Sequence, residues 1–165
     1  MTPPLLLIDV DGVISLYGAA RAGSHGLVGT LVDGVPHLLS RRAGAVLKTL
    51  MRDFECVWCT GWEERADEHL PALLDLPRGW PYVRFPDAPA LDAHWKLAGI
   101  DAFAGPSRPL AWIDDAHDAS CRAWAAARPG PTLLVTTAPD VGLTEADGGT
   151  LRRWAAAQAG QDATR

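Results

Sequence analysis

The sequence predicts an α/β fold: a parallel sheet with helices on both faces and a small β-hairpin flap beside it. Short apolar runs of strand length alternate along the chain with stretches whose apolar residues recur at helical spacing. Such alternation favours parallel strands joined by right-handed crossovers. Several of the apolar runs end directly in acidic or hydroxyl residues, as strands do when a site lies at their carboxyl ends. With 165 residues, the chain suits a single domain, residues 1–165.

The composition argues against several classes of protein. The chain is 48% apolar and 21% charged, which is ordinary for a globular domain and too apolar for disorder. Its formal net charge of −5 gives no electrostatic basis for non-specific nucleic-acid binding. No apolar run approaches the roughly 18 residues of a membrane span, and no basic segment precedes the first apolar run. Three cysteines make a poor disulfide framework, so we expect a soluble cytoplasmic protein.

The first apolar run, Leu5–Ile8, is typical of a strand buried on both faces. Asp9 and Asp11 follow it, and burying carboxylates in the middle of a strand is strongly unfavourable. We therefore expect the strand to end at about Asp9, with both acids at its carboxyl tip. Gly12 then lets the backbone turn sharply away from the strand.

The flap is predicted at about residues 13–39. Two apolar runs, Leu27–Val32 and Val35–Leu39, flank Asp33-Gly34, and Asp-Gly between apolar runs is a strong hairpin signal. Ser40 is a typical N-cap for the helix that follows. The apolar face of that helix consists of Ala43, Val46, Leu47, Leu50 and Met51.

The middle of the chain predicts a second strand at Phe54–Cys59. Thr60 and Glu63 fit a capping box that opens the next helix. The inward face of that helix consists of Ala66, Leu70, Leu73 and Leu74. Tyr82–Phe85 is expected to form one further short strand.

The last part of the chain predicts a short helix from Leu91 to about Ala98, which carries Lys96. The apolar run Leu110–Ile113 predicts another buried strand, and it too ends in acids, Asp114 and Asp115. The remaining elements are a helix at Ala119–Ala127, a strand at Thr132–Thr136, a cap at Thr144–Asp147, a helix at Leu151–Ala159 and a frayed end at Gln161–Arg165.

Three predicted strands thus end in groups that suit phosphoryl transfer, and in a parallel sheet all three ends lie on the same edge. Carboxylates from two strands and a backbone carbonyl suffice to hold Mg²⁺, which prefers oxygen ligands and keeps several waters. Asp9 is the candidate nucleophile, and Asp11 is the candidate general acid and base. Thr60 and the amide of Gly61, at a helix N-terminus, are candidates to bind phosphate. Lys96 is the candidate cation that offsets the clustered anions.

The order and content of these segments resemble the four motifs of the haloacid dehalogenase superfamily. The four matches are Asp9-Val10-Asp11-Gly12, Thr60 after the strand that contains Cys56-Val57-Trp58-Cys59, Lys96, and Asp114-Asp115 with Asp118 behind. The resemblance spans about Leu5 to Asp118 and implies a Rossmann-like sheet. It also implies that Asp9, Asp115 and the backbone carbonyl of Asp11 bind the metal, with Asp114 as a direct or outer ligand.

The short gaps between these motifs resemble the branch of the superfamily that has no cap domain. The resemblance therefore implies a Mg²⁺-dependent phosphohydrolase that acts through an aspartyl phosphate on a phosphomonoester. The phosphorylated substrate is expected to be a small metabolite, a nucleotide or a nucleic-acid end, so nucleic acid enters only as a substrate. A partner chain, including a second copy in a homo-oligomer, is a further way to close such a site.

Other interpretations of the same residues remain open at this point. A catalytically inactive module of the same fold would bind phosphate or a partner through the same acids. Cys56 and Cys59 match a C-x-x-C redox motif, although an offset of three in a strand points the two side chains to opposite faces. Lys96 is alternatively a solvated helix lysine, and His117 and Trp62 are alternatively packing residues instead of substrate contacts.

Overall fold

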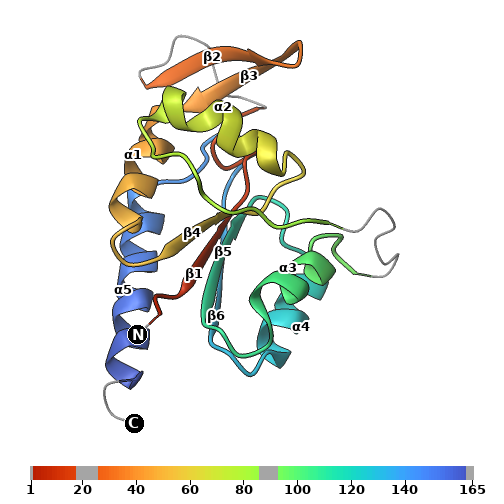
Figure 1. The fold of residues 1–165 in the computed structure, drawn as a ribbon, viewed down its shortest axis with the longest axis vertical. Coiled ribbons are helices and arrows are strands. Elements are labelled where there is room, and N and C mark those ends of the chain that lie inside the picture. Colours follow the sequence, from red (N-terminus) through yellow and green to blue (C-terminus); the bar gives the residue numbers. More distant parts are fainter. Residues whose placement is uncertain (1, 18–25, 86–92, 163–165) are drawn as a thin grey trace.

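The computed structural model describes residues 2–17, 26–85 and 93–162, and it confirms the α/β fold (Figure 1). Four parallel strands form one sheet in the order β4-β1-β5-β6. They are β1 (Leu5–Ile8), β4 (Glu55–Trp58), β5 (Leu110–Asp114) and β6 (Thr132–Thr136). The register places Ile8 opposite both Trp58 and Ile113, so the residues that follow these strands emerge at one level.

Helices cover both faces of the sheet. The central strand β1 needs this cover because its side chains are apolar on both faces. All four residues of β1 are completely buried, and alternate residues belong to two separate apolar layers. Leu6 and Ile8 pack in the layer of α1 (Arg41–Leu50), α2 (Glu64–Leu74) and α5 (Glu145–Asp162). Leu5 and Leu7 pack in the layer of α3 (Leu97–Ala104) and α4 (Ala119–Ala127), on the other side in Figure 1. Burial of each of these side chains contributes about 1.5–3 kcal/mol.

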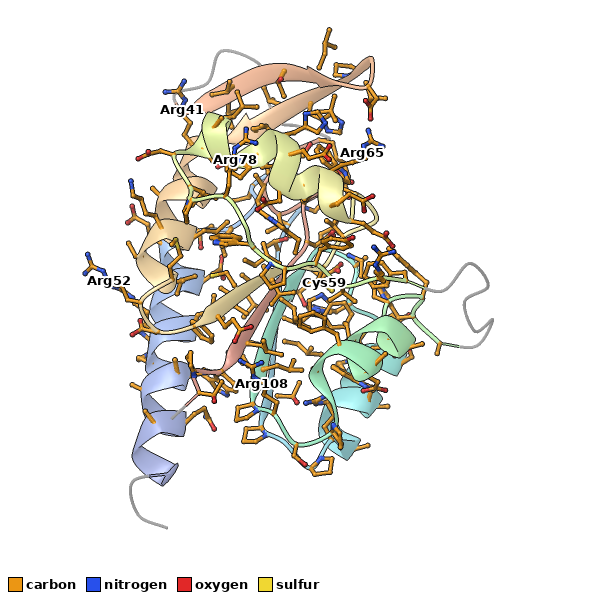
Figure 2. All side chains as sticks on the ribbon, viewed as in Figure 1. Arg41, Arg52, Cys59, Arg65, Arg78 and Arg108 are labelled. Atoms are coloured by element: carbon orange, nitrogen blue, oxygen red, sulfur yellow. The ribbon has the colours of Figure 1, made fainter. Side chains whose placement is uncertain are left out.

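The predicted hairpin is present as β2 (Leu27–Val32) and β3 (Val35–Ser40), which pair antiparallel. Asp33 and Gly34 at its turn have φ of 50° and 79°, which is the backbone conformation that a two-residue hairpin turn requires. The hairpin lies beside α2, and Arg65 of α2 forms an ion pair with Asp33 (Figures 1 and 2). Residues 18–25 of the expected flap lie outside the described part.

Ser40 caps α1 as predicted, because its Oγ accepts a hydrogen bond of 3.1 Å from the amide of Ala43. The expected cap at Thr144–Asp147 is also present. The Asp147 carboxylate accepts from the Thr144 amide at 2.9 Å, and the Asp147 amide donates to the Thr144 hydroxyl at 3.3 Å. The single cap at Ser40 and the reciprocal cap at Thr144 and Asp147 mark where α1 and α5 begin.

The helices α3 and α5 differ from their predicted bounds. The helix expected at Leu91–Ala98 begins only at Leu97, and residues 91 and 92 lie outside the described part. His94 prevents an earlier start, because its amide donates to Ser120 and its Nδ1 accepts from the Lys96 amide. The last helix begins at Glu145, six residues before the expected start, and its backbone remains helical to Asp162, where fraying was expected. The Gly148-Gly149 pair weakens the sequence signal there, yet Gly148 is needed for close packing on Val46.

The capping box predicted for Thr60 and Glu63 is wrong. The helix begins at Glu64, and the Glu63 carboxylate instead accepts a hydrogen bond from the Phe85 amide at 3.1 Å. A tertiary contact therefore replaces the expected local one. The short strand expected at Tyr82–Phe85 is reduced to one bridge between Tyr82 and Trp58.

The longest helix, α5, has 18 residues and carries both acidic and basic side chains. Within the part of the chain that the structure describes, no helix has the combination of length and apolar character that crossing a membrane requires.

Candidate metal centre and its surroundings

Three carboxylates meet at the carboxyl edge of the sheet. Asp9 directly follows β1, Asp114 is the last residue of β5, and Asp115 comes next in the chain. One carboxylate oxygen from each lies within 4.8 Å of the other two. The Asp9 amide donates to the Ile113 carbonyl at 3.0 Å, which fixes the end of β1 against the end of β5. The expected convergence of the strand ends is therefore present.

Lys96 is buried against two of these acids instead of being solvated. Its Nζ lies 2.9 Å from Asp9 Oδ1 and 2.7 Å from Asp114 Oδ2. Only 3% of the residue is exposed. Lys96 immediately precedes α3, so the turn at His94 and the start of that helix together direct its side chain toward the sheet edge.

The charges of this group depend strongly on burial. Burial raises the pKa of Asp9 to about 7, with the Asp114 carboxylate adding to the effect and the Lys96 ammonium opposing it. Burial alone lowers the pKa of Lys96, but the Asp9 and Asp114 carboxylates outweigh this and hold it above its ordinary value. Among the described residues, Lys96 pairs with only two of the three carboxylates, Asp9 and Asp114, and this leaves an excess of negative charge that a metal cation would neutralise.

The carboxylate of Asp115 lies directly over Gly12. A Cβ at Gly12 would come within 2.2 Å of Asp115 Oδ2, and the φ of +73° there also favours glycine. The carbonyl of Gly12 accepts a hydrogen bond of 2.8 Å from the buried hydroxyl of Thr137. Gly12 is therefore needed both for the turn that follows β1 and for the approach of Asp115 to Asp9.

The remaining contacts orient the individual acids. Asp114 Oδ1 accepts from the Ala116 amide at 2.9 Å, so both oxygens of Asp114 have partners. The hydroxyl of Tyr17 donates to Asp115 Oδ2, and this hydrogen bond raises the pKa of Tyr17 to about 12. Tyr17 is itself half exposed and thus lies at the mouth of the site.

Asp11 lies beside the three-carboxylate group and is not part of it. Its side chain is 53% exposed, and its Oδ2 accepts a hydrogen bond of 3.0 Å from the indole nitrogen of Trp62. Its Oδ1 lies 3.9 Å from Nδ1 of His37 in the hairpin. The side chain of Asp11 is therefore available to solvent and to a ligand, whereas Asp9 is buried.

Thr60 and Gly61 follow β4 at the same edge of the sheet. Thr60 is buried and its Oγ1 accepts from the Trp62 amide at 3.3 Å, whereas Gly61 is exposed next to Trp95. The helix was expected to begin at Thr60, but α2 begins only at Glu64. A turn therefore separates Thr60 and Gly61 from the N-terminus of the helix. The helix dipole therefore acts at a greater distance than the sequence predicts.

The donor set of Asp9, Asp114 and Asp115 fits a divalent metal ion. Carboxylate oxygens are the ligands of hard cations such as Mg²⁺ and Ca²⁺, and the excess negative charge favours such an ion. The group could therefore hold a metal at the edge of the sheet where ligands bind in open α/β folds.

The cysteines do not form a redox site. Cys56 and Cys59 are both free and lie in the two different apolar layers of the sheet, as their offset predicts. Figure 2 shows Cys59 inside the molecule near the end of β4. Burial raises the pKa of the Cys56 thiol to about 12 and that of Cys59 well above its ordinary value. Both thiols are therefore unreactive packing groups.

Asp118 and His117 have structural roles. The Asp118 carboxylate caps α4 by accepting from the Cys121 amide at 3.0 Å. His117 packs edge-on against Trp112 and its Nδ1 shares a hydrogen bond of 2.9 Å with Thr136. The substrate contact considered for His117 gains no support from this placement.

Sequence reasoning missed several residues around the site. Tyr17, His37 and Thr137 reach it from the loop after β1, the hairpin and the end of β6. A signal was present only for Thr137, which follows a predicted strand just as Thr60 does. The other two depend on how the hairpin lies against the sheet edge, which no local pattern reveals.

Comparison with protein-family models gave no match to this chain. A search of curated proteins likewise found no match. The fold and the site define an α/β protein with a candidate metal centre of three aspartates.

Proposed function

We propose that this protein is a Mg²⁺-dependent phosphohydrolase of the haloacid dehalogenase type, acting on a phosphomonoester through an aspartyl-phosphate intermediate. The observation that carries the proposal is the meeting of Asp9, Asp114 and Asp115 with the buried Lys96 at the carboxyl edge of a parallel sheet. A nucleophile, a cation site and a positive charge for phosphate are then present in one place.

Asp9, Asp115 and the backbone carbonyl of Asp11 would hold Mg²⁺, with Asp114 as a direct or outer ligand. When bound, the ion neutralises the charges of the nucleophile and the phosphate, which otherwise repel each other. The same neutralisation favours the ionised form of Asp9, whose pKa burial raises to about 7.

Asp9 attacks the phosphorus atom in line with the leaving oxygen. A bond forms between a carboxylate oxygen of Asp9 and phosphorus while the bond to the leaving oxygen breaks. Lys96, held at 2.9 Å from Asp9, orients the nucleophile and balances the negative charge of the phosphoryl group. Thr60 and Gly61, which follow the neighbouring strand, are proposed to bind the phosphoryl oxygens.

Asp11 acts as general acid and then as general base. Its carboxyl proton passes to the leaving oxygen in the first step, and its carboxylate then accepts a proton from the attacking water. The water oxygen bonds to phosphorus, which releases phosphate and restores the carboxylate of Asp9. The exposed position of Asp11 suits this exchange with substrate and solvent.

The substrate class follows from the short segments between the site motifs. Because only a hairpin of two six-residue strands flanks the site, we propose that it accepts a nucleotide, a small phosphorylated metabolite or a nucleic-acid end. We propose that the substrate reaches the acids past the hairpin, either in a single copy of the chain or with a second copy closing the site.

The test is turnover of p-nitrophenyl phosphate and a panel of phosphorylated metabolites, nucleotides and oligonucleotide ends. Asp9→Asn is expected to abolish turnover while the fold, checked by circular dichroism, is kept. Asp53→Asn, an exposed acid on the turn after α1, is the matched control and retains activity. EDTA stops the reaction and added Mg²⁺ restores it. Unchanged turnover in Asp9→Asn would remove Asp9 from the mechanism, and Mg²⁺ binding without turnover of any substrate would favour an inactive binding module.

A further inference from the structure

We propose that Trp62 is a positioning residue that holds Asp11 in its acid–base role, and that His37 of the hairpin braces it. This inference rests on the proposed function and deepens it. Trp62 and His37, which take no direct part in the proposed chemistry, would then keep the exposed Asp11 carboxylate in a working orientation.

Asp11 needs such support because its surroundings do not confine it. Its side chain is 53% exposed, whereas Asp9 and Asp114 are buried and paired with Lys96. A general acid must lie within hydrogen-bond reach of the atom that it protonates. A displacement of about 1 Å at such a group can cost about 100-fold in rate.

Trp62 supplies a fixed hydrogen bond to one oxygen of this acid. Its indole nitrogen donates to Asp11 Oδ2 at 3.0 Å, which leaves Oδ1 to carry the proton that is transferred. The indole N–H is only a donor and does not ionise near neutral pH. Trp62 can therefore orient Asp11 without competing for that proton.

His37 and Ser15 hold the indole from the other side. The ring of His37 packs edge-on against Trp62, with centroids 4.6 Å apart and an interplanar angle of 66°. Nδ1 of His37 shares a hydrogen bond of 2.9 Å with the hydroxyl of Ser15, which is buried. The same nitrogen lies 3.9 Å from Asp11 Oδ1, beyond hydrogen-bond distance. The contacts thus run from Ser15 through His37 to Trp62 and on to Asp11, and His37 also lies within ion-pair distance of Asp11.

These residues come from three separate segments of the chain. Ser15 lies in the loop after β1, His37 lies in β3, and Trp62 lies in the turn before α2. The hairpin therefore contacts the acid–base group through His37 and Trp62. A substitution in this chain of contacts should change the transfer of the proton and leave attack by Asp9 intact.

Substrates with different leaving groups distinguish a defect in proton transfer by Asp11 from a defect in attack by Asp9. An alkyl leaving oxygen needs the proton from Asp11 as its bond to phosphorus breaks, whereas p-nitrophenolate departs without one. In Trp62→Phe we expect kcat for glycerol phosphate to fall about tenfold or more, and kcat for p-nitrophenyl phosphate to change less than about threefold. KM for both substrates stays close to the wild-type value, because the phosphate ligands are unchanged.

Trp154→Phe is the matched control, since Trp154 of α5 stacks on Phe54 and, among the described residues, forms no ring contact or hydrogen bond with Asp11, His37 or Trp62. His37→Asn is the second variant. We expect its kcat for glycerol phosphate to fall selectively as well, but by a smaller factor than in Trp62→Phe. Both are compared with wild type by circular dichroism.

Equal loss on both substrates, or no loss on either, in a folded Trp62→Phe or His37→Asn protein would overturn the positioning role. The same selective loss in Trp154→Phe would overturn it as well. A wild-type protein that turns over neither these two substrates nor any other phosphomonoester of the panel would instead overturn the proposed function itself, and the role of Trp62 with it.

Discussion

Lys96 carries its positive charge where water is largely excluded. Removing one partner of a buried ion pair is costly because the other charge is left without compensation. The chain has one other lysine, Lys48, whose partner Asp75 lies on the surface, where ion pairs contribute little to stability. The two lysines therefore form a natural comparison between a buried and an exposed ammonium group.

Lys96→Met is expected to lower the free energy of unfolding by about 3–5 kcal/mol at pH 8, because it leaves Asp9 and Asp114 buried with no cation between them. Urea denaturation followed by circular dichroism measures this. Lys48→Met is the control and should change the midpoint little. A similar small change in both variants would show that the acids do not depend on Lys96.

At the scale of single residues, the sequence allowed the acids to be predicted and left their surroundings open. Asp9, Asp114 and Asp115 directly follow apolar runs, so their position at a strand end needs no tertiary information. The burial of Lys96 depends on a turn held by Ser120, which lies 24 residues further along the chain. Contacts of that kind arise only once two distant segments pack together.

At the scale of secondary structure, the strands were predicted more closely than the helices. A buried strand is defined by its own apolar run, and all four sheet strands lie within one residue of their expected bounds. Helix starts depend on which side chain accepts from the free amides. At Glu63 the carboxylate bonds to Phe85, and at Lys96 the amide bonds to His94, so α2 and α3 begin later than expected.

The N-cap of helix α4 is the carboxyl group of Asp118, which can be protonated at low pH. The hydroxyl of Ser120 donates to the Asp118 carboxylate, and with the amide of Cys121 it lowers the pKa of Asp118 to about 2. A carboxyl group whose pKa is lowered on folding stabilises the protein above its unfolded pKa of about 3.8. That stabilisation is lost as the pH falls from about 3.8 through about 2.

Asp118→Ala should therefore melt at a lower temperature than wild type at pH 7, because α4 loses the partner of its first free amides. The difference between the two melting temperatures should narrow as the pH falls from 4 to 2, since protonation removes the same interaction from wild type. Thermal unfolding at several pH values measures this. Asp53→Ala is the control, and a difference that stays constant down to pH 2 would contradict the assignment.

At the scale of the whole molecule, a metal held by Asp9, Asp114 and Asp115 would link the ends of β1 and β5. The three carboxylates come together only in the folded chain, so a metal held by all of them binds the native state much better than the unfolded state. Such binding stabilises the fold by about 2.7 kcal/mol when the free metal is about 100 times its Kd.

Mg²⁺ is accordingly expected to raise the melting temperature of the wild-type protein by several degrees and to do so saturably. Asp115→Asn should lose most of this shift, because it removes one of the three carboxylates without disturbing the buried pair of Asp9 and Lys96. Scanning calorimetry across a Mg²⁺ titration is the measurement. An equal shift in both proteins would show that the ion acts elsewhere on the surface.

The position of β1 between β4 and β5 has a consequence for how the chain folds as it is synthesised. β1 leaves the ribosome before both of its neighbours in the sheet, and one of these, β5, ends only at Asp114. Before β5 has been synthesised, Leu5–Ile8 can pair only with β4. The apolar side chains on both faces of β1 then remain partly exposed to water. Nascent chains that stop before residue 110 should therefore be recognised by chaperones, whereas chains that extend through α4 can close the central sheet.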